Sequence, residues 1–157
     1  MSGGVSRRRL LLAVALSDVG MTGALAATAP RDEEVSAATI ARLLGGAQAQ
    51  VGRIEVVLPQ ISESGNAVPL SVSVDSPMTA GDHVRSIHVV AERNPRSWIA
   101  SFTLGPHAGR AAIETRIRLS DSQTVTVLAQ MSDSSWWMRK TEVTVIIGAC
   151  DSRGPNY

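Results

Sequence analysis

The chain has 157 residues, of which 44% are hydrophobic, 18% charged and only 3% aromatic. This length suits one globular domain and is too short for two well-buried cores. Its fifteen basic residues, fourteen arginines and Lys140, are scattered among fourteen acids, so the chain lacks the basic stripe of a nucleic-acid-binding protein. Because aromatic residues are scarce, the interior has to be built from Val, Ile, Leu and Ala, which favours an all-β design.

The first 26 residues have the features of an export signal. Arginines at 7–9 precede an apolar stretch at 10–16, and small residues at 24–26 have the spacing that a signal peptidase accepts. The arginines resemble those of a twin-arginine signal, so we expect residues 1–26 to be removed and the mature protein to be periplasmic. The alternative is an ordinary basic leader or anchor, but the apolar run is far shorter than the ~20 residues that span a bilayer. We therefore expect no membrane segment in the mature form.

We expect one domain over residues 27–150, beginning with a short helix. Between residues 33 and 44, the side chains of Ile40, Leu43 and Leu44 share one helical face. Acidic residues occupy the first turn and two glycines follow the last, as is typical of helix ends.

After the helix, apolar residues recur with a period of two, as half-buried strands require. The clearest case is the alternation of Val68, Leu70, Val72 and Val74 with other residues. Strands are also predicted at 54–58, 87–91, 98–104, 113–119, 125–131 and 143–147, the last with Val143, Val145 and Ile147 on one face. About seven strands separated by turn-rich segments predict an immunoglobulin-like β-sandwich.

The only cysteine, Cys150, follows the last predicted strand. A lone cysteine cannot form an intramolecular disulfide or a multi-thiolate metal site, so it is either a buried small hydrophobe or a thiol kept for chemistry. In an oxidising compartment an unpaired thiol invites mixed disulfides unless its reactivity is used. Gly148 before it and Asp151 after it argue against burial and favour the chemical interpretation.

Other chemistry-bearing side chains do not form a recognisable site. His83 and His88 are five positions apart and would lie on opposite faces of a strand, so we interpret them, with His107, as solvated or loop residues and not as metal ligands. Ser76 lies in an Asp-Ser-Pro turn sequence with no evident histidine partner. The motifs for haem attachment, phosphate loops and zinc proteases do not occur, so neither a metal, a cofactor nor an enzymatic activity is expected.

Two features suggest contact with a partner. Trp136 and Trp137 are consecutive, so on a strand one would face the core and the other would face solvent, where it could anchor an interface. Arg116 and Arg118 would share the outward face of their strand with Glu114. They would either guide a partner or simply solvate that strand.

Several short blocks of the mature chain resemble the SoxY family of thiosulfate oxidation. They are Leu-Pro-Gln-Ile at 58–61, Gly-Asn-Ala-Val-Pro-Leu at 65–70, Val-Asp-Ser-Pro-Met-Thr at 74–79, Ile-His-Val at 87–89, Asn-Pro at 94–95, Thr-Arg-Ile-Arg-Leu at 115–119 and Gly-Ala-Cys at 148–150. The likeness extends over roughly residues 40–150, and the twin-arginine leader also fits this family.

The resemblance implies a periplasmic, non-enzymatic carrier that pairs with SoxZ and holds sulfur intermediates covalently on Cys150. In such a pathway a haem protein of the SoxAX kind joins thiosulfate oxidatively to the thiol, and SoxB hydrolyses off sulfate. A SoxCD-like enzyme can then oxidise the remaining sulfane sulfur. The bound sulfur would be the only cofactor-like group of such a carrier.

The cysteine motif departs from the family pattern. The family usually ends in Gly-Gly-Cys-Gly-Gly, whereas Gly148, Ala149, Cys150 and Asp151 form the corresponding arm here, and residues 148–157 make up the arm and tail. Such an arm is stiffer, because alanine has fewer backbone conformations than glycine. The alternative, a periplasmic immunoglobulin-like binding module that has lost carrier duty, therefore stays open.

Overall fold

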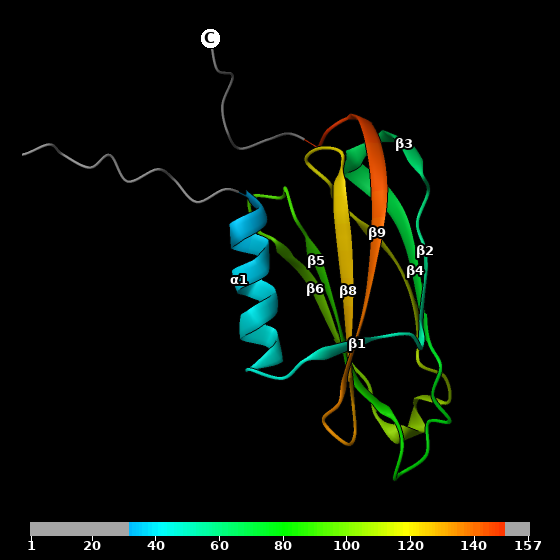
Figure 1. The fold of residues 1–157 in the computed structure, drawn as a ribbon. Coiled ribbons are helices and arrows are strands. Elements are labelled where there is room, and N and C mark those ends of the chain that lie inside the picture. The colour runs from blue at the N-terminus through cyan, green and yellow to red at the C-terminus, as the bar shows by residue number, and fades with distance from the viewer. Residues whose placement is uncertain (1–31, 150–157) are drawn as a thin grey trace, which may run out of the picture.

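The computed structural model describes residues 32–149, and the elements within this range are labelled in Figure 1. They are α1 (Asp32–Leu44), β1 (Ala49–Val51), β2 (Ile54–Val57), β3 (Ile61–Ser64), η1 (Gly65–Ala67), β4 (Val68–Val74), β5 (Val84–Ala91), β6 (Trp98–Thr103), η2 (Pro106–Ala108), β7 (Ala112–Ile117), β8 (Gln123–Met131) and β9 (Trp136–Ile147). None of the helices among these residues is long and apolar enough to cross a membrane.

The strands form two sheets that pack face to face. The larger sheet has the order β1-β9-β8-β5-β6, with β3 also paired to β9, and the smaller sheet has the order β2-β4-β7. The predicted immunoglobulin-like β-sandwich with an N-terminal helix is confirmed, but with nine strands in the described range instead of about seven. The two additional strands, β1 and β3, are short and pair with β9 in parallel, a non-local arrangement that their own sequences do not reveal.

The core lies between the two sheets and follows the predicted alternation. The inward side chains of β4 (Val68, Leu70, Val72 and Val74) are all buried, and they belong to one cluster with side chains from β5 and β8. Complete burial of such a side chain stabilises a fold by about 1.5–3 kcal/mol. Aliphatic side chains therefore provide most of this core, as the scarcity of aromatic residues predicts.

The other face of the larger sheet is covered by α1, which lies beside it in Figure 1. Leu43 and Leu44 pack with Val90, Leu128 and Trp136 in a second apolar cluster. Because β5 is covered on both faces, its last five residues are all buried instead of alternating.

The longest strand, β9, has 12 residues and pairs with three other strands. It pairs with β8 along most of its length, with β1 near its beginning and with β3 near its end. Val143 and Val145 face the core as predicted, but Ile147 is exposed, because β9 continues past the edge of the core at this end. The described chain ends two residues later, at Ala149.

Candidate functional site at the end of β9

Three segments that are distant in sequence meet where β9 ends: η1, the β7–β8 connection and residues 148–149. The backbone N–H of Ala149 donates to the carbonyl oxygen of Leu119 at 2.9 Å, and the N–H of Leu119 donates to the carbonyl of Gly65 at 2.8 Å. We call Gly65, Leu119, Ser120, Gly148 and Ala149 the β9 anchor. Its bonds hold the chain against the sandwich beyond the last residue of the strand.

Both glycines of the β9 anchor are needed for close backbone contact. A Cβ atom on Gly148 would overlap the carbonyl oxygen of Ser120. A Cβ atom on Gly65 would overlap the carbonyl oxygen of Leu119 and lie 2.8 Å from the nitrogen of Ala149. Only glycine allows a backbone approach this close, so Gly148 serves packing at a position where the sequence suggested freedom of movement.

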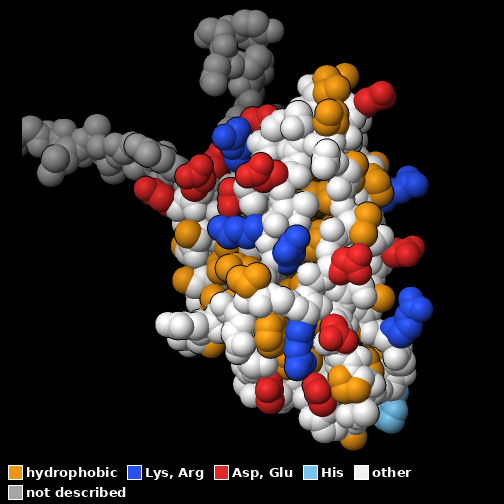
Figure 2. Space-filling view, turned by 45° about the vertical axis from the view of Figure 1, so that its right-hand side comes forward, with side chains coloured by type: hydrophobic (Ala, Val, Ile, Leu, Met, Phe, Trp, Pro, Cys, Tyr) orange, Lys and Arg blue, Asp and Glu red, His pale blue; other side chains and the backbone are white. Residues whose placement is uncertain are grey.

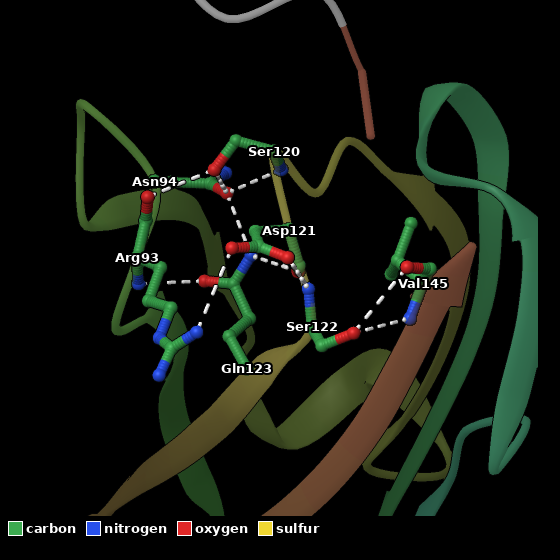
Figure 3. A network of polar contacts seen from close by, with 7 residues as sticks. All are labelled: Arg93, Asn94, Ser120, Asp121, Ser122, Gln123 and Val145. Carbon is green, nitrogen blue, oxygen red and sulfur yellow. Dashed lines mark hydrogen bonds and ion pairs between the residues drawn. The ribbon is translucent and has the colours of Figure 1, made fainter. Parts of the chain in front are cut away.

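A polar network joins the β5–β6 loop to the β7–β8 connection (Figure 3). The Oδ1 atom of Asn94 accepts the backbone N–H of Ser120 at 3.0 Å and the Nε2–H of Gln123 at 2.9 Å. The Nδ2 of Asn94 donates to the carbonyl of Arg118 at 2.7 Å, and Gln123 accepts the N–H of Arg93 at 2.7 Å. The side chain of Asn94 thus fixes the loop that carries the Ser120 carbonyl.

The same loop is tied directly to β9. The hydroxyl of Ser122 accepts the backbone N–H of Val145 at 2.9 Å and donates to its carbonyl at 3.3 Å. An ion pair between Arg93 and Asp121, at 3.5 Å, joins the two loops at the surface. Because both side chains of this pair are about half exposed, its contribution to stability is small.

The structure describes only part of the predicted arm. Gly148 and Ala149 belong to the β9 anchor, and Ala149 is buried, with 9% of its surface exposed. Cys150, Asp151 and the remaining tail lie outside the described residues, as does the predicted signal at 1–26. The site can therefore be described up to the residue that directly precedes the cysteine.

Three exposed isoleucines lie beside the β9 anchor, and the sequence analysis did not identify them as a surface. Ile61 is 65% exposed, and Ile146 and Ile147 are each 66% exposed. Of the three, only Ile147 was predicted to face the core, together with Val143 and Val145.

The histidine interpretation is wrong for His88, which is buried on the helix-covered face of β5. Its Nε2 lies 3.0 Å from the hydroxyl of Ser86, and its Nδ1 lies 2.9 Å from that of Ser101. The rings of Trp98 and Trp136 are each 5.8 Å from the imidazole. Burial lowers the pKa of His88 below its ordinary value, because the charged form loses its hydration.

The two consecutive tryptophans also differ from the expectation. Trp136 is buried beneath α1, while Trp137 points to the opposite face and packs partly buried against the main core. The guanidinium of Arg53 lies 5.1 Å from the ring centre of Trp137. Neither tryptophan is the exposed interface residue that alternation alone suggested, because both faces of this sheet are covered.

The other candidate residues lie where the sequence suggested. The hydroxyl of Ser76 accepts the N–H of Met78 at 3.3 Å, a local turn contact, and Glu114, Arg116 and Arg118 are exposed. In the part of the chain that the structure describes, no group of three or more His, Cys, Asp or Glu side chains could hold a metal ion.

Comparison with known families decides what kind of protein this is. The family model described as "Sulfur oxidation protein SoxY" matches residues 40–150. The chain belongs to the SoxY family. The matched range begins within α1, includes the whole sandwich and ends at Cys150. SoxY proteins are sulfur carriers, so the chain is a sulfur-oxidation carrier protein and not an enzyme.

One solved structure supports this assignment, and another shares only the fold. The sulfur carrier protein SoxY from Chlorobium limicola f thiosulfatophilum is 25% identical, with a TM-score of 0.59 over 71% of this chain and 96% of that chain. A superoxide reductase (neelaredoxin) from Ignicoccus hospitalis shares the fold at 16% identity, with a TM-score of 0.54 over 60% of this chain and 80% of that one. None of the curated proteins matches the chain.

Proposed function

We propose that this SoxY-family chain carries intermediates of thiosulfate oxidation covalently on Cys150, in the periplasm, and presents them to Sox enzymes. The observation that supports this most is the β9 anchor, which fixes the backbone as far as Ala149, the residue directly before the only cysteine of the chain. A carrier needs a defined point from which its reactive group extends, and we propose that the β9 anchor is that point.

The chemistry requires a thiolate and an electron acceptor. In the loading step, the thiolate of Cys150 and thiosulfate form a sulfur–sulfur bond and give up two electrons to a haem protein of the SoxAX kind. The product is a cysteine S-thiosulfonate. In the next step, a SoxB-like enzyme adds water, releasing sulfate and two protons and leaving a persulfide on Cys150. A cysteine is suited to this role because sulfur–sulfur bonds exchange readily through thiolates.

The remaining parts of the proposal concern location and partners. Residues 1–26 resemble a twin-arginine signal and would direct the folded protein to the periplasm. A SoxZ-like subunit would form a heterodimer with the chain, and a SoxCD-like enzyme would act on the persulfide. Both partners are implied by the resemblance to the SoxY family and belong to the same proposal.

The direct test is the intact mass of the protein purified from cells grown on thiosulfate. Carrier function predicts added masses that correspond to bound sulfur species and that disappear after reduction. A Cys150→Ser variant from the same cells should show no added mass. If the wild-type chain carries no reducible mass under these conditions, a binding module that has lost carrier duty becomes the better account of the altered Gly-Ala-Cys-Asp-Ser motif.

A further inference from the structure

The strongest unexplained feature of the surface is the free edge of β7. This strand is the outer one of the smaller sheet, and none of the described strands pairs with its other side. Glu114 and Arg116 are exposed on its outer face. Their register partners on β4 are Ser71 and Pro69, which carry no charge. The two charged side chains therefore find no counter-charge directly opposite them in their own sheet.

The backbone of β7 shows which of its residues are available for pairing. The N–H of Val74 donates to the carbonyl of Ala111 at 2.9 Å, in continuation of the β4–β7 register. Because hydrogen-bonded pairs alternate along an antiparallel ladder, the odd-numbered residues of β7 bond to β4. Pro69 agrees with this, since it has no N–H and stands opposite Arg116. The N–H and C=O groups of Glu114 and Arg116 therefore point away from β4, toward the free edge.

The partner whose charges fit this edge is a second copy of the same strand. In a symmetric dimer the two β7 strands run antiparallel, and the residue at the two-fold axis decides which side chains face each other. With the axis at Thr115, Glu114 of each copy faces Arg116 of the other. With the axis at Glu114 or at Arg116, like charges face each other directly, which is destabilising. The charge pattern therefore selects one register, and this register contains two Glu–Arg pairs.

The remaining surface agrees with a partner of mixed charge. Figure 2 shows acidic and basic side chains interspersed over the face that it presents, and the chain has 15 basic and 14 acidic residues. A strongly charged partner such as a nucleic acid requires a basic area, whereas an identical chain brings both signs of charge to the edge. The selected register also places Ile113 opposite Ile117 of the other copy, so apolar side chains meet on the inner face of the joined sheet.

We propose that the β7 edge is a self-association surface, at which two copies of the chain pair their β7 strands antiparallel around Thr115. The two smaller sheets then form one continuous sheet, and the Glu114 carboxylate of each copy forms an ion pair with the Arg116 guanidinium of the other. The pairing ends before Arg118, whose carbonyl already accepts the Nδ2–H of Asn94 at 2.7 Å. A contact this short belongs to the weak, transient class of interfaces, so monomers and dimers should exchange. This inference is independent of the proposed carrier function.

The test is sedimentation equilibrium of the full mature chain, kept in reductant so that disulfide-linked dimers through Cys150 do not form. The mass is followed over a roughly hundredfold range of concentration. Wild type is compared with Glu114→Arg, with Arg116→Glu, with an equal mixture of these two variants and with the double variant Glu114→Arg/Arg116→Glu. Glu63→Arg is the matched control, because it reverses the same charge at an exposed position on β3.

We expect the mass of wild type to rise toward that of two chains as the concentration increases. Each single variant should associate at least about tenfold more weakly, because the two-fold axis turns both ion pairs into like-charge pairs. The equal mixture should associate as wild type does, since a copy with two arginines at the edge then meets a copy with two glutamates. The double variant, which exchanges the two charges, should also associate, and Glu63→Arg should match wild type.

Three results would each overturn the proposal. The first is a wild-type chain that stays monomeric at every concentration. The second is a dimer whose strength is the same in wild type and in both single variants, which would place the contact elsewhere on the molecule. The third is an equal mixture that associates no better than its two components, although thermal unfolding shows that both are folded.

Discussion

At the scale of single residues, Gly148 has the most direct connection to the proposed function. It stands two positions before Cys150, and its backbone is packed against the carbonyl of Ser120. Its lack of a side chain therefore helps to hold the chain in place. Movement of Gly148 or Ala149 would require the β9 anchor to open.

The first prediction concerns this packing. Gly148→Ala should reduce the free energy of unfolding by about 1–3 kcal/mol, because the new Cβ atom would force the β7–β8 connection away from β9. Gly81→Ala is the matched control, since a Cβ atom there would meet nothing within 4 Å. Chemical denaturation of both variants measures the difference. Equal stability of the two would show that the close approach of Gly148 and Ser120 is not a feature of the folded protein.

The second prediction concerns pH and His88. Because burial lowers the pKa of His88 in the folded state, the unfolded chain binds a proton more readily than the folded chain does. Stability should therefore be constant above the ordinary histidine pKa of about 6.5 and decrease as the pH falls below it. Denaturation curves between pH 5 and pH 7.5 measure this loss.

His88→Gln should remove this part of the acid sensitivity, because glutamine does not titrate. His107 is exposed in η2, so His107→Gln serves as the control and should lose stability on acidification as the wild type does. An unchanged pH dependence in His88→Gln would contradict the assignment to the buried imidazole.

At the scale of elements, the polar network joins the loops that support the end of β9. Asn94 accepts hydrogen bonds from Ser120 and Gln123 and donates one to Arg118. Removing its side chain takes this partner from the Ser120 N–H and the Arg118 carbonyl, while the Nε2 of Gln123 keeps its bond to the carbonyl of Asp121. We expect Asn94→Ala to cost about 1–3 kcal/mol of stability and to speed hydrogen exchange at the Ala149 amide, which bonds to the same connection.

Asn66 is a suitable control for this variant, because its side chain makes an exposed bond with Ser64. Asn66→Ala should change stability by no more than about 0.5 kcal/mol. If exchange at Ala149 is as slow in Asn94→Ala as in wild type, the network does not support the β9 anchor.

The contact of α1 with the sheet gives another prediction at this scale. The hydroxyls of Thr39 and Ser97 are 2.8 Å apart and buried. Thr39→Val should cost about 1–3 kcal/mol, because it leaves the Ser97 hydroxyl without this partner. Adding Ser97→Ala should recover part of the loss, and a double-mutant cycle measures that coupling. Additive effects of the two substitutions would argue against a direct hydrogen bond.

At the scale of the whole molecule, the sequence predicted the main architecture because most strands alternate clearly. The pattern of β4 predicts its buried face correctly, and Ile40, Leu43 and Leu44 pack as a helical face should. The short strands β1 and β3 were missed because three or four residues carry too little periodicity, and their parallel pairing with β9 depends on distant segments.

The remaining differences have one physical cause: a strand's pattern does not show which parts of the sheet are covered. His88 and one of the two tryptophans, Trp136 or Trp137, were expected to be exposed, but α1 covers one face of the sheet and the second sheet covers the other. Ile147 was expected to be buried, but β9 extends beyond the core. The sequence predicts Cys150 as the attachment residue, and that prediction lies outside the described residues. The sequence does not reveal the β9 anchor, because the close approach of Gly148 to Ser120 depends on how the β7–β8 connection folds.

The central claim is that one thiol is available outside the packed sandwich, directly after an anchored strand. The rate at which iodoacetamide alkylates Cys150 in the native protein, compared with the same protein in denaturant, tests it most directly. The account predicts rates that agree within about threefold, because an exposed thiol reacts according to its thiolate fraction. A native rate slower by about a hundredfold would mean that the thiol reacts only when the structure opens, and it would contradict the carrier account.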